Sequence, residues 1–211
     1  MDYTPSHIEI DAEELAPQSN KKKRVAVAVI CVLLVVVLAV ASALLVKTYV
    51  ISSFIVDGIS MYPTLDGGNG ASTEGSSHEE RTNGEVLYLN KIAKIKRGDI
   101  VVFSAPSSSL ISPDGTAQTL VKRVIAIEGD HLQIIDNVVY LNGTAIDEPY
   151  INDGASMDNL DITVKSGYIF CMGDNRNHST DSRYFGQVPL DNVVGKCFLI
   201  KGIDGKLRWV K

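Results

Sequence analysis

Hydrophobic and polar residues divide this chain into one long apolar run and a series of short runs. Residues 25–46 are 22 consecutive uncharged positions, of which 21 are apolar and only Ser42 is polar. At about 1.5 Å per residue this run forms a helix of roughly 33 Å, enough to cross the hydrocarbon layer of a bilayer once. The pattern therefore predicts a single transmembrane helix. It excludes a wholly soluble protein, and it excludes a multi-span transporter because no second run of this length follows.

Beyond residue 46 the apolar residues occur in short runs separated by Gly, Asn and Asp, which is typical of antiparallel strands. Asp136-Asn137 between two alternating runs predicts a tight hairpin. The expected strands are 85–89, 99–103, 120–127, 132–135, 138–141, 168–172 and 193–200. We therefore expect a mainly β protein: one N-terminal transmembrane helix followed by a single antiparallel β domain. Residues 66–84 contain almost no large apolar side chain and are predicted to form a flexible loop.

Charge divides the chain at the same place as hydropathy. Residues 1–20 carry five acids and no Lys or Arg, whereas Lys21, Lys22, Lys23 and Arg24 directly precede the apolar run. Only Lys47 lies close on the far side. Because basic residues that flank a span remain in the cytoplasm, this asymmetry predicts the orientation.

Three parts follow from that orientation: a cytoplasmic tail (1–24), a transmembrane helix (25–46) and an extracytoplasmic β domain (47–211) in the cell membrane. A cleaved signal peptide is the alternative, since small-x-small triplets such as residues 39–41 occur. The triplets lie inside the apolar run, however, and the run is longer than the usual 7–15 residues of a signal-peptide core. The pattern favours an uncleaved anchor.

Composition narrows the possible partners of the extracytoplasmic domain. It holds 16 basic and 20 acidic residues, so nothing indicates nucleic-acid binding. Cys31 lies in the predicted span, while Cys171 and Cys197 either pair or remain two buried thiols. The chain has no CxxC or HExxH spacing, and no glycine loop that cradles phosphate precedes a helix. We expect neither a metal nor a cofactor.

A serine in a constrained turn is the first candidate for chemistry. Ser60 lies between Gly58, which permits unusual backbone paths, and Pro63, which fixes its own φ and restricts Tyr62. Such a turn can expose the Ser60 hydroxyl and leave its backbone N–H free to face a developing oxyanion. A purely structural turn would use the same residues.

Two adjacent cations occur within the apolar segment 120–127. In a strand Lys122 and Arg123 point to opposite faces, and both faces are otherwise apolar. Arginine stays charged and requires an anionic partner, whereas a desolvated lysine can become a neutral amine that acts as a general base. The alternative is that Lys122 reaches water at a sheet edge.

The densest polar segment is 173–186, which holds two acids, two arginines and two serines behind the expected strand 168–172. Such a segment can supply the hydroxyl and the ion pairs that orient a buried lysine, or it is a polar loop held by its own turns. A fourth motif, Arg97-Gly98-Asp99, enters a strand and is expected to be framework.

Together these segments resemble the bacterial type I signal peptidases, the membrane-anchored serine proteases that remove signal peptides. Residues 60–65 (Ser-Met-Tyr-Pro-Thr-Leu) look like the nucleophile motif, and Lys122-Arg123 like the general-base motif. Arg97-Gly98-Asp99 opens the second motif of the family, and residues 173–183 match its last and longest. The order of the motifs agrees over nearly all of residues 25–198.

The resemblance implies a Ser/Lys dyad. Ser60 would be the nucleophile and Lys122 the general base, as in the bacterial branch, where this position is a lysine rather than a histidine. Ser179 would hydrogen-bond and orient the Lys122 amine, and Asp181 and Arg183 would brace the site as an ion pair. The Ser60 backbone N–H would stabilise the oxyanion.

Gly58 departs from the pattern of some relatives, which place a second serine hydroxyl there for the oxyanion, so this chain has no side-chain donor at that position. The insert 66–84 is also longer than the core of the family requires. A Ser–His–Asp arrangement using His78, His131 or His178 is the internal rival to the dyad.

The resemblance implies that the substrates are preproteins with small residues at the first and third positions before the scissile bond, bound extended along a sheet edge. The 14 residues from Val46 to Ser60 span at most about 46 Å, so Ser60 would work near the outer membrane surface. The apolar side chains around Ser60 either enter the lipid interface or belong to the core. They are Ile51, Phe54, Ile55, Val56, Met61 and Tyr62.

Three other functions are compatible with parts of the sequence. A specialised signal peptidase for pilus or surface proteins would carry the same motifs. A non-enzymatic, membrane-anchored β-rich binding module would account for the anchor and the strands but not for Lys122 or residues 173–186. A self-cleaving Ser/Lys repressor would require a DNA-binding helical module, for which residues 1–24 are too short and too acidic.

Overall fold

The computed structural model describes residues 19–68, 84–106, 110–112, 115–151 and 154–210, so most of the predicted cytoplasmic tail and of the loop 66–84 lies outside the described residues. Helix α1 (Ser19–Tyr49) contains the predicted span, and a window within its residues 21–49 has a mean hydropathy of 3.3. By length and composition α1 can cross a membrane once. The chain divides into two units, 1–46 and 47–211.

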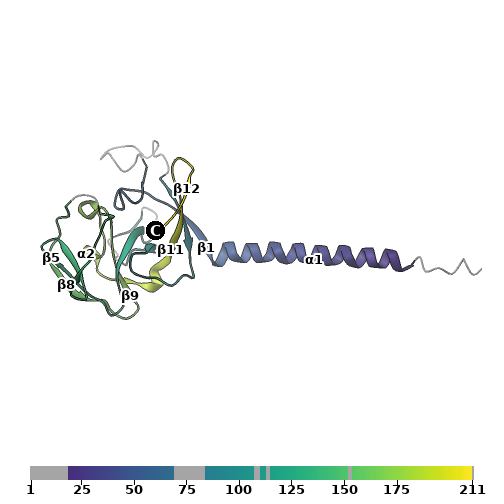
Figure 1. Cartoon of the computed structure of the whole chain (residues 1–211), viewed down its shortest axis with the longest axis horizontal. Coiled ribbons are helices and arrows are strands. Elements are labelled where there is room, and N and C mark those ends of the chain that lie inside the picture. Colours follow the sequence, from purple (N-terminus) through teal and green to yellow (C-terminus); the bar gives the residue numbers. More distant parts are fainter. Residues whose placement is uncertain (1–18, 69–83, 107–109, 113–114, 152–153, 211) are drawn as a thin grey trace, which may run out of the picture. The chain divides into compact units, whose positions relative to one another are not determined.

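The second unit is built on an eight-stranded antiparallel sheet (Figure 1). Its strand order is β1-β2-β11-β3-β4-β9-β10, and β12 pairs with β11. The strands are β1 (Ile51–Ile55), β2 (Val86–Asn90), β3 (Ile100–Ser104), β4 (Thr119–Ile127), β9 (Tyr168–Met172), β10 (Val188–Pro189), β11 (Val193–Lys201) and β12 (Leu207–Trp209). Strand β4 therefore lies inside the sheet, between β3 and β9.

A smaller four-stranded antiparallel sheet is inserted between β4 and β9, in the order β7-β6-β5-β8. Its strands are β5 (His131–Ile135), β6 (Val138–Leu141), β7 (Thr144–Ala145) and β8 (Leu160–Thr163). Asp136 and Asn137, which join β5 to β6, have φ of 49° and 68°. Positive φ at both central residues is the signature of the tight hairpin that the sequence predicted. In Figure 1, β5 and β8 lie at one end of this unit and β1 and β12 at the other, with β9 between them.

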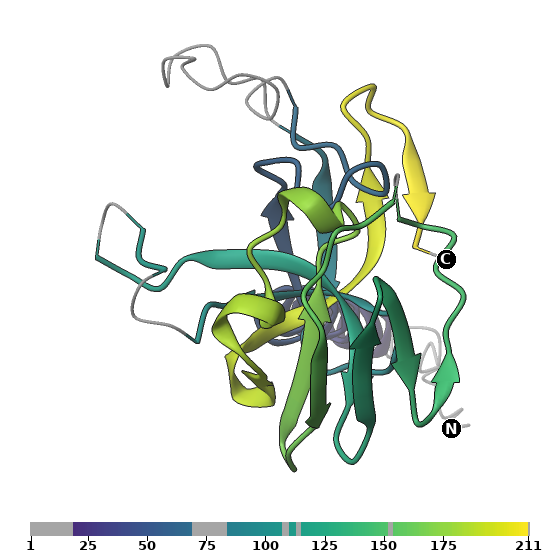
Figure 2. The same ribbon diagram turned by 90° about the vertical axis from the view of Figure 1, so that its left-hand side faces the viewer.

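The remaining elements are short helices near the chain's polar segments. Helix α2 is Ser182–Phe185, and two 3-10 turns are Arg176–His178 and Leu190–Asn192. The C-terminal hairpin, yellow in Figure 2, is formed by the end of β11 and by β12. The fold is thus mainly β after one long apolar helix, as predicted.

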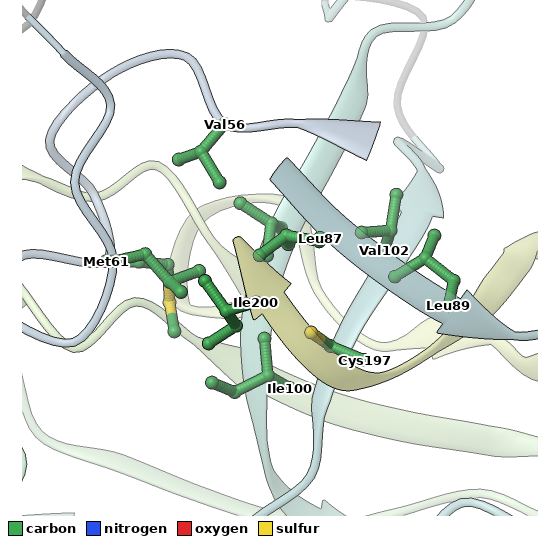
Figure 3. Packing of buried hydrophobic residues seen from close by; sticks show 10 residues of the cluster. Val56, Met61, Leu87, Leu89, Ile100, Val102, Cys197 and Ile200 are labelled. Carbon is green, nitrogen blue, oxygen red and sulfur yellow. The ribbon is translucent and has the colours of Figure 1, made fainter. Parts of the chain in front are cut away.

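A buried cluster packs around β2, β3 and β11 (Figure 3). Val56 and Met61, 2% and 1% exposed, enter this cluster from both ends of the turn that holds Ser60. In Figure 3 both side chains point towards the strands that carry Leu87, Ile100 and Ile200. Burying two large apolar side chains on either side of the turn fixes it against the sheet, since each contributes about 1.5–3 kcal/mol.

The seven predicted strands are all present, each within one residue of its predicted ends. Strands β1, β7, β8, β10 and β12 were not predicted. Three of them have two or three residues, too few for a periodic pattern, and β1 consists of Ile and Phe around two serines that resemble a continuation of the apolar run. Cys171 and Cys197 are both buried and free, and they belong to different core clusters, so they do not pair.

Candidate active site

The structure brings Lys122 and Ser60 together across 62 positions of sequence. Lys122 lies on β4, opposite Val101 of β3, and is only 3% exposed. Its Nζ lies 2.7 Å from Ser60 Oγ and 3.1 Å from the Val121 carbonyl oxygen. The alternative that Lys122 reaches water at a sheet edge is wrong, because β4 has a neighbour on both sides.

Burial also changes the chemistry of this amine. Desolvation lowers the pKa of Lys122 to about 8, and the positive charge of Arg183 acts in the same direction. The carboxylates of Asp181 and Asp174 oppose this effect because they favour the protonated amine. A lysine with an ordinary pKa of 10.5 is almost fully charged near neutral pH, whereas this one holds a substantial neutral fraction. A neutral amine 2.7 Å from a hydroxyl can accept its proton.

The turn that carries Ser60 is fixed by its backbone as well as by its core contacts. Gly58 has φ +94°, a conformation that few other residues adopt. Within the turn, Tyr62 N donates to the Ile59 carbonyl oxygen at 3.0 Å. Tyr62 and Pro63 are joined by a cis peptide bond. The Ser60 backbone N–H donates to no acceptor among the described residues, so it is available to a bound substrate.

The polar segment 173–183 packs directly against this turn. A Cβ atom added at Gly173 would collide with the Ser60 carbonyl oxygen and with Ser179 Oγ, so only glycine fits there. Asn175 N donates to the same Ser60 oxygen at 3.1 Å. The close approach places the three remaining candidate residues beside the Ser60–Lys122 pair.

Asp181 is the centre of this segment. It is fully buried and caps α2, and its carboxylate forms the ion pair with Arg183 Nε at 2.8 Å that the resemblance implies. The carboxylate also accepts hydrogen bonds from Gly173 N at 2.9 Å and from Ser179 Oγ at 2.7 Å. A buried carboxylate with this many donors holds the loop in one conformation.

Ser179 makes a different contact from the expected hydrogen bond to the Lys122 amine. Its hydroxyl donates to Asp181, while Lys122 Nζ is bonded to Ser60 Oγ and to the Val121 carbonyl. Among the residues that the structure describes, Ser179 and Lys122 therefore share no hydrogen bond. The two are linked indirectly, because Asp181 accepts from Ser179 and acts electrostatically on Lys122.

Arg123 has the anionic partner that its burial demands. Its Nε and Nη2 donate to the two carboxylate oxygens of Asp174 at 2.9 and 2.7 Å, and its Nη1 donates to the Gly98 carbonyl at 2.9 Å. The guanidinium also lies 3.9 Å from the centre of the Tyr150 ring. The motif Arg97-Gly98-Asp99 is therefore framework that accepts from Arg123.

Glu148 and Tyr150 were missed by the sequence analysis. Glu148 receives two hydrogen bonds from Arg176, at 2.9 and 2.6 Å, and one from Tyr150 at 2.8 Å. Both residues lie in a segment without a recognisable motif. The available signal was a surplus of cations: Arg123 lies within an apolar segment, Arg176 and Arg183 follow another, and the two acids of 173–183 can neutralise only two of the three.

The histidines do not form the rival Ser–His–Asp arrangement within the described part of the chain. His131 Nε2 lies 2.6 Å from Asp161 in the small sheet, and His178 is exposed and has no bond to Ser60. His78 lies outside the described residues. Nor does the described part hold a group of three or more His, Cys, Asp or Glu that could bind a metal.

The apolar side chains near Ser60 divide between the two expected locations. Val56 and Met61 belong to the core, whereas Ile51, Ile55 and Tyr62 are 36%, 49% and 48% exposed. Their exposure leaves an apolar surface on β1 and on the nucleophile turn.

The chain is similar to known proteins over most of its length. The family described as "Signal peptidase, peptidase S26" matches residues 29–201. Signal peptidase I of Bacillus caldolyticus is 34% identical over 176 residues, covering 75% of this chain and 83% of that protein. Signal peptidase I T of Bacillus subtilis is also 34% identical, covering 75% and 77%.

A chloroplast protein and a solved structure are also similar. Thylakoidal processing peptidase 1 of Arabidopsis thaliana is 31% identical over 161 residues, but the chain spans only 44% of its length. The crystal structure of a signal peptidase I from Enterococcus faecalis is 30% identical in sequence, with a TM-score of 0.42. The match covers 50% of this chain and 97% of the crystallised chain.

Proposed function

The chain belongs to the signal peptidase family, peptidase S26, and we propose that Ser60 and Lys122 form the dyad with which it cleaves signal peptides. It is a membrane-associated serine endopeptidase, and the alternative of a non-enzymatic binding module is therefore wrong. The observation that carries the dyad is the 2.7 Å distance between Lys122 Nζ and Ser60 Oγ at a site where burial lowers the lysine pKa.

The proposed reaction proceeds in two steps. Lys122, as the neutral amine, takes the proton of the Ser60 hydroxyl while Oγ attacks the scissile carbonyl carbon, and the Lys122 ammonium then protonates the leaving amine. An acyl-enzyme on Ser60 remains. This acyl group is the signal peptide, since the mature protein has left as the amine. Lys122 next deprotonates a water molecule, which attacks the ester carbonyl. The Lys122 ammonium then returns a proton to Ser60 Oγ as the signal peptide is released.

Supporting roles are proposed for the residues around the dyad. The Ser60 backbone N–H faces the oxyanion in both steps, since Gly58 has no side chain to do so. Asp181 and Arg183 hold the 173–183 segment in place through their ion pair. Ser179 completes that segment by donating to Asp181, and in this arrangement its influence on the Lys122 amine passes through the carboxylate.

The substrates are signal-peptide-bearing preproteins, and we propose that the scissile bond follows small residues at the first and third positions. The cations at residues 21–24 support an orientation with residues 47–211 outside the cytoplasm. The exposed Ile51, Ile55 and Tyr62 support contact of this surface with lipid. In that position the enzyme meets the emerging end of a membrane-held signal peptide.

Incubation of the full chain with one defined preprotein tests the dyad. Mass spectrometry of the products should show a single cut after a small-x-small sequence. Ser60→Ala and Lys122→Ala should each abolish the cut, while circular dichroism shows an unchanged fold. His178→Ala should cleave at the wild-type rate. Substantial cleavage by purified Lys122→Ala would exclude this dyad.

A further inference from the structure

Asn175 ties the polar segment to the nucleophile turn through two hydrogen bonds. Its backbone N–H donates to the Ser60 carbonyl oxygen at 3.1 Å, and its side-chain Nδ2 donates to the Ile59 carbonyl oxygen at 3.1 Å. The amide nitrogen, rather than Oδ1, must face Ile59, because two carbonyl oxygens cannot bond to each other. One residue therefore holds two consecutive carbonyls of the turn.

The neighbours of Asn175 fix its own position. Asp174 is fully buried in its ion pair with Arg123 on β4. Arg176 is equally buried in its ion pair with Glu148, and its Nε donates to the Gly173 carbonyl at 3.0 Å. Asn175 thus extends from a segment that is anchored on both sides, and its amide is a fixed donor.

The bond to Ile59 determines the direction of a different group. The Ile59–Ser60 peptide is trans, and in a planar trans peptide the carbonyl and the N–H point in opposite directions. A donor that holds the Ile59 oxygen on one side therefore sets the direction of the Ser60 N–H on the other. Tyr62 N also donates to this oxygen, but Tyr62 belongs to the turn and moves with it.

We propose that Asn175 is a positioning residue whose side-chain amide, by holding the Ile59 carbonyl, aims the Ser60 N–H at the oxyanion of the tetrahedral intermediate. The inference rests on the proposed function of Ser60. It has particular weight in this chain because Gly58 contributes no hydroxyl, so the direction of a single backbone N–H decides how well the oxyanion is bound.

Asn175→Ala in the full chain removes the side-chain bond and keeps the backbone bond to Ser60. We expect kcat on the defined preprotein to fall about tenfold to a hundredfold, below the loss of up to about a thousandfold that follows complete removal of an oxyanion donor. KM should change less than about twofold, because the ground-state carbonyl makes little use of this donor. The midpoint of the pH profile should not move, since Asp181 and Arg183 still surround Lys122.

A peptide boronate supplies a readout of the oxyanion itself. Ser60 Oγ adds to the trigonal boron while Lys122 takes the hydroxyl proton, and a boron-bound oxygen of the tetrahedral adduct occupies the oxyanion position. Asn175→Ala should weaken this inhibitor by about the same factor as kcat/KM. A merely structural role of Asn175 would loosen the loop and change KM and the pH midpoint as well.

Two variants serve as controls. Asn177→Ala removes the same side chain two residues away, where it bonds to Ser156 N at 2.9 Å and to the Gly154 carbonyl at 3.2 Å, and should leave kcat and boronate affinity within about twofold. Asn175→Asp keeps the size of the side chain and the backbone bond, but it places a carboxylate oxygen against the Ile59 carbonyl oxygen. It should be no more active than Asn175→Ala.

Three results would overturn the inference: wild-type kcat in Asn175→Ala, wild-type kcat in Asn175→Asp, or a loss of kcat without loss of boronate affinity. A shifted pH midpoint would also overturn it in favour of general loosening. If Ser60→Ala still cleaves the preprotein, the dyad itself fails. An inactive Ser60→Ala beside a fully active Asn175→Ala rejects the role of Asn175 alone.

Discussion

Lys122, the proposed general base, is buried at the expense of stability. Removal of an ammonium group from water is unfavourable, and here the nearby Asp181 carboxylate compensates only in part, because the pKa remains lowered. Arg123, its neighbour in sequence, is buried with a dedicated carboxylate and stays charged. Two adjacent cations on opposite faces of one strand thus have opposite roles, one structural and one chemical.

The rate of cleavage should follow the titration of Lys122. Only the neutral amine accepts the Ser60 proton, and the pKa of Lys122 is lowered to about 8, so kcat/KM should rise with pH and level off above about 8. A pH–rate profile on a substrate without titrating groups measures this. A midpoint near the ordinary lysine value of 10.5 would contradict the burial of the amine.

Replacement of this lysine by a neutral isostere should stabilise the protein. The pKa falls from 10.5 in the unfolded chain to about 8 in the folded one, which corresponds to about 3 kcal/mol of destabilisation. The full destabilisation is present below pH 8 and is lost as the pH rises through 10.5. Lys122→Met should therefore be more stable at pH 7, by up to about 3 kcal/mol, and this difference should shrink at high pH. Chemical denaturation at both pH values measures it; a less stable Lys122→Met at pH 7 would contradict the expectation.

At the scale of elements, the site depends on the position of β4 within the sheet. Strand β3 pairs with one edge of β4 and β9 with the other, and the turn that carries Ser60 lies over the Lys122 amine, which leaves Lys122 only 3% exposed. The polar segment leaves the end of β9 and returns over this position. The pair of Arg123 and Asp174 connects the strand to the segment, and that connection brings Asp181 and Asn175 to the dyad.

Removal of one partner of this pair should have a large effect on stability. Asp174→Ala leaves Arg123 buried without an anion and should cost about 3–5 kcal/mol of unfolding free energy. Asp204→Ala removes an ion pair to Lys206 that is exposed on both sides, and should change stability by less than about 1 kcal/mol. Denaturant titration of both variants compares them. Equal effects would mean that the buried pair is not what joins β4 to the segment.

At the scale of the whole molecule, the β unit has its own core, and we expect it to fold without the anchor. Its buried clusters consist of residues beyond position 55, and the apolar side chains of α1 are exposed. The anchor therefore contributes location rather than fold. In the proposed orientation it keeps the site near substrates that are themselves held in the membrane.

A chain that begins at residue 47 should fold and retain the dyad. It should cleave a short soluble peptide at a rate within about threefold of the full chain, because the site lies entirely within 47–211. On a preprotein reconstituted in vesicles it should be at least tenfold slower, since membrane tethering raises the effective substrate concentration. An equal loss of cleavage rate on the peptide and on the preprotein would show instead that α1 supports the fold of the site.

The exposed apolar residues and the exposed C-terminal hairpin could not be predicted from the sequence. Seven strands of four or more residues were predicted because their apolar pattern is a local property, whereas β1 and β8, of five and four residues, were missed. Strands β10 and β12 exist only because a longer strand offers them a partner. Likewise, Val56 and Met61 could not be distinguished from Ile55 and Tyr62 until the core that receives two of them was known.

The sequence by itself determined the apolar span and the β character of the rest, and it led to the two residues proposed as the dyad, since residue types and their order carry that information. Tertiary structure alone decided that Ser60 and Lys122 lie 2.7 Å apart, that Ser179 donates to Asp181, and that Glu148 neutralises Arg176. The physical reason is that hydropathy and motif order are local, whereas burial and hydrogen-bond partners depend on residues far apart in the chain. The lowered pKa of Lys122 belongs to the second group, because it arises from burial of the amine by residues far from it in the sequence.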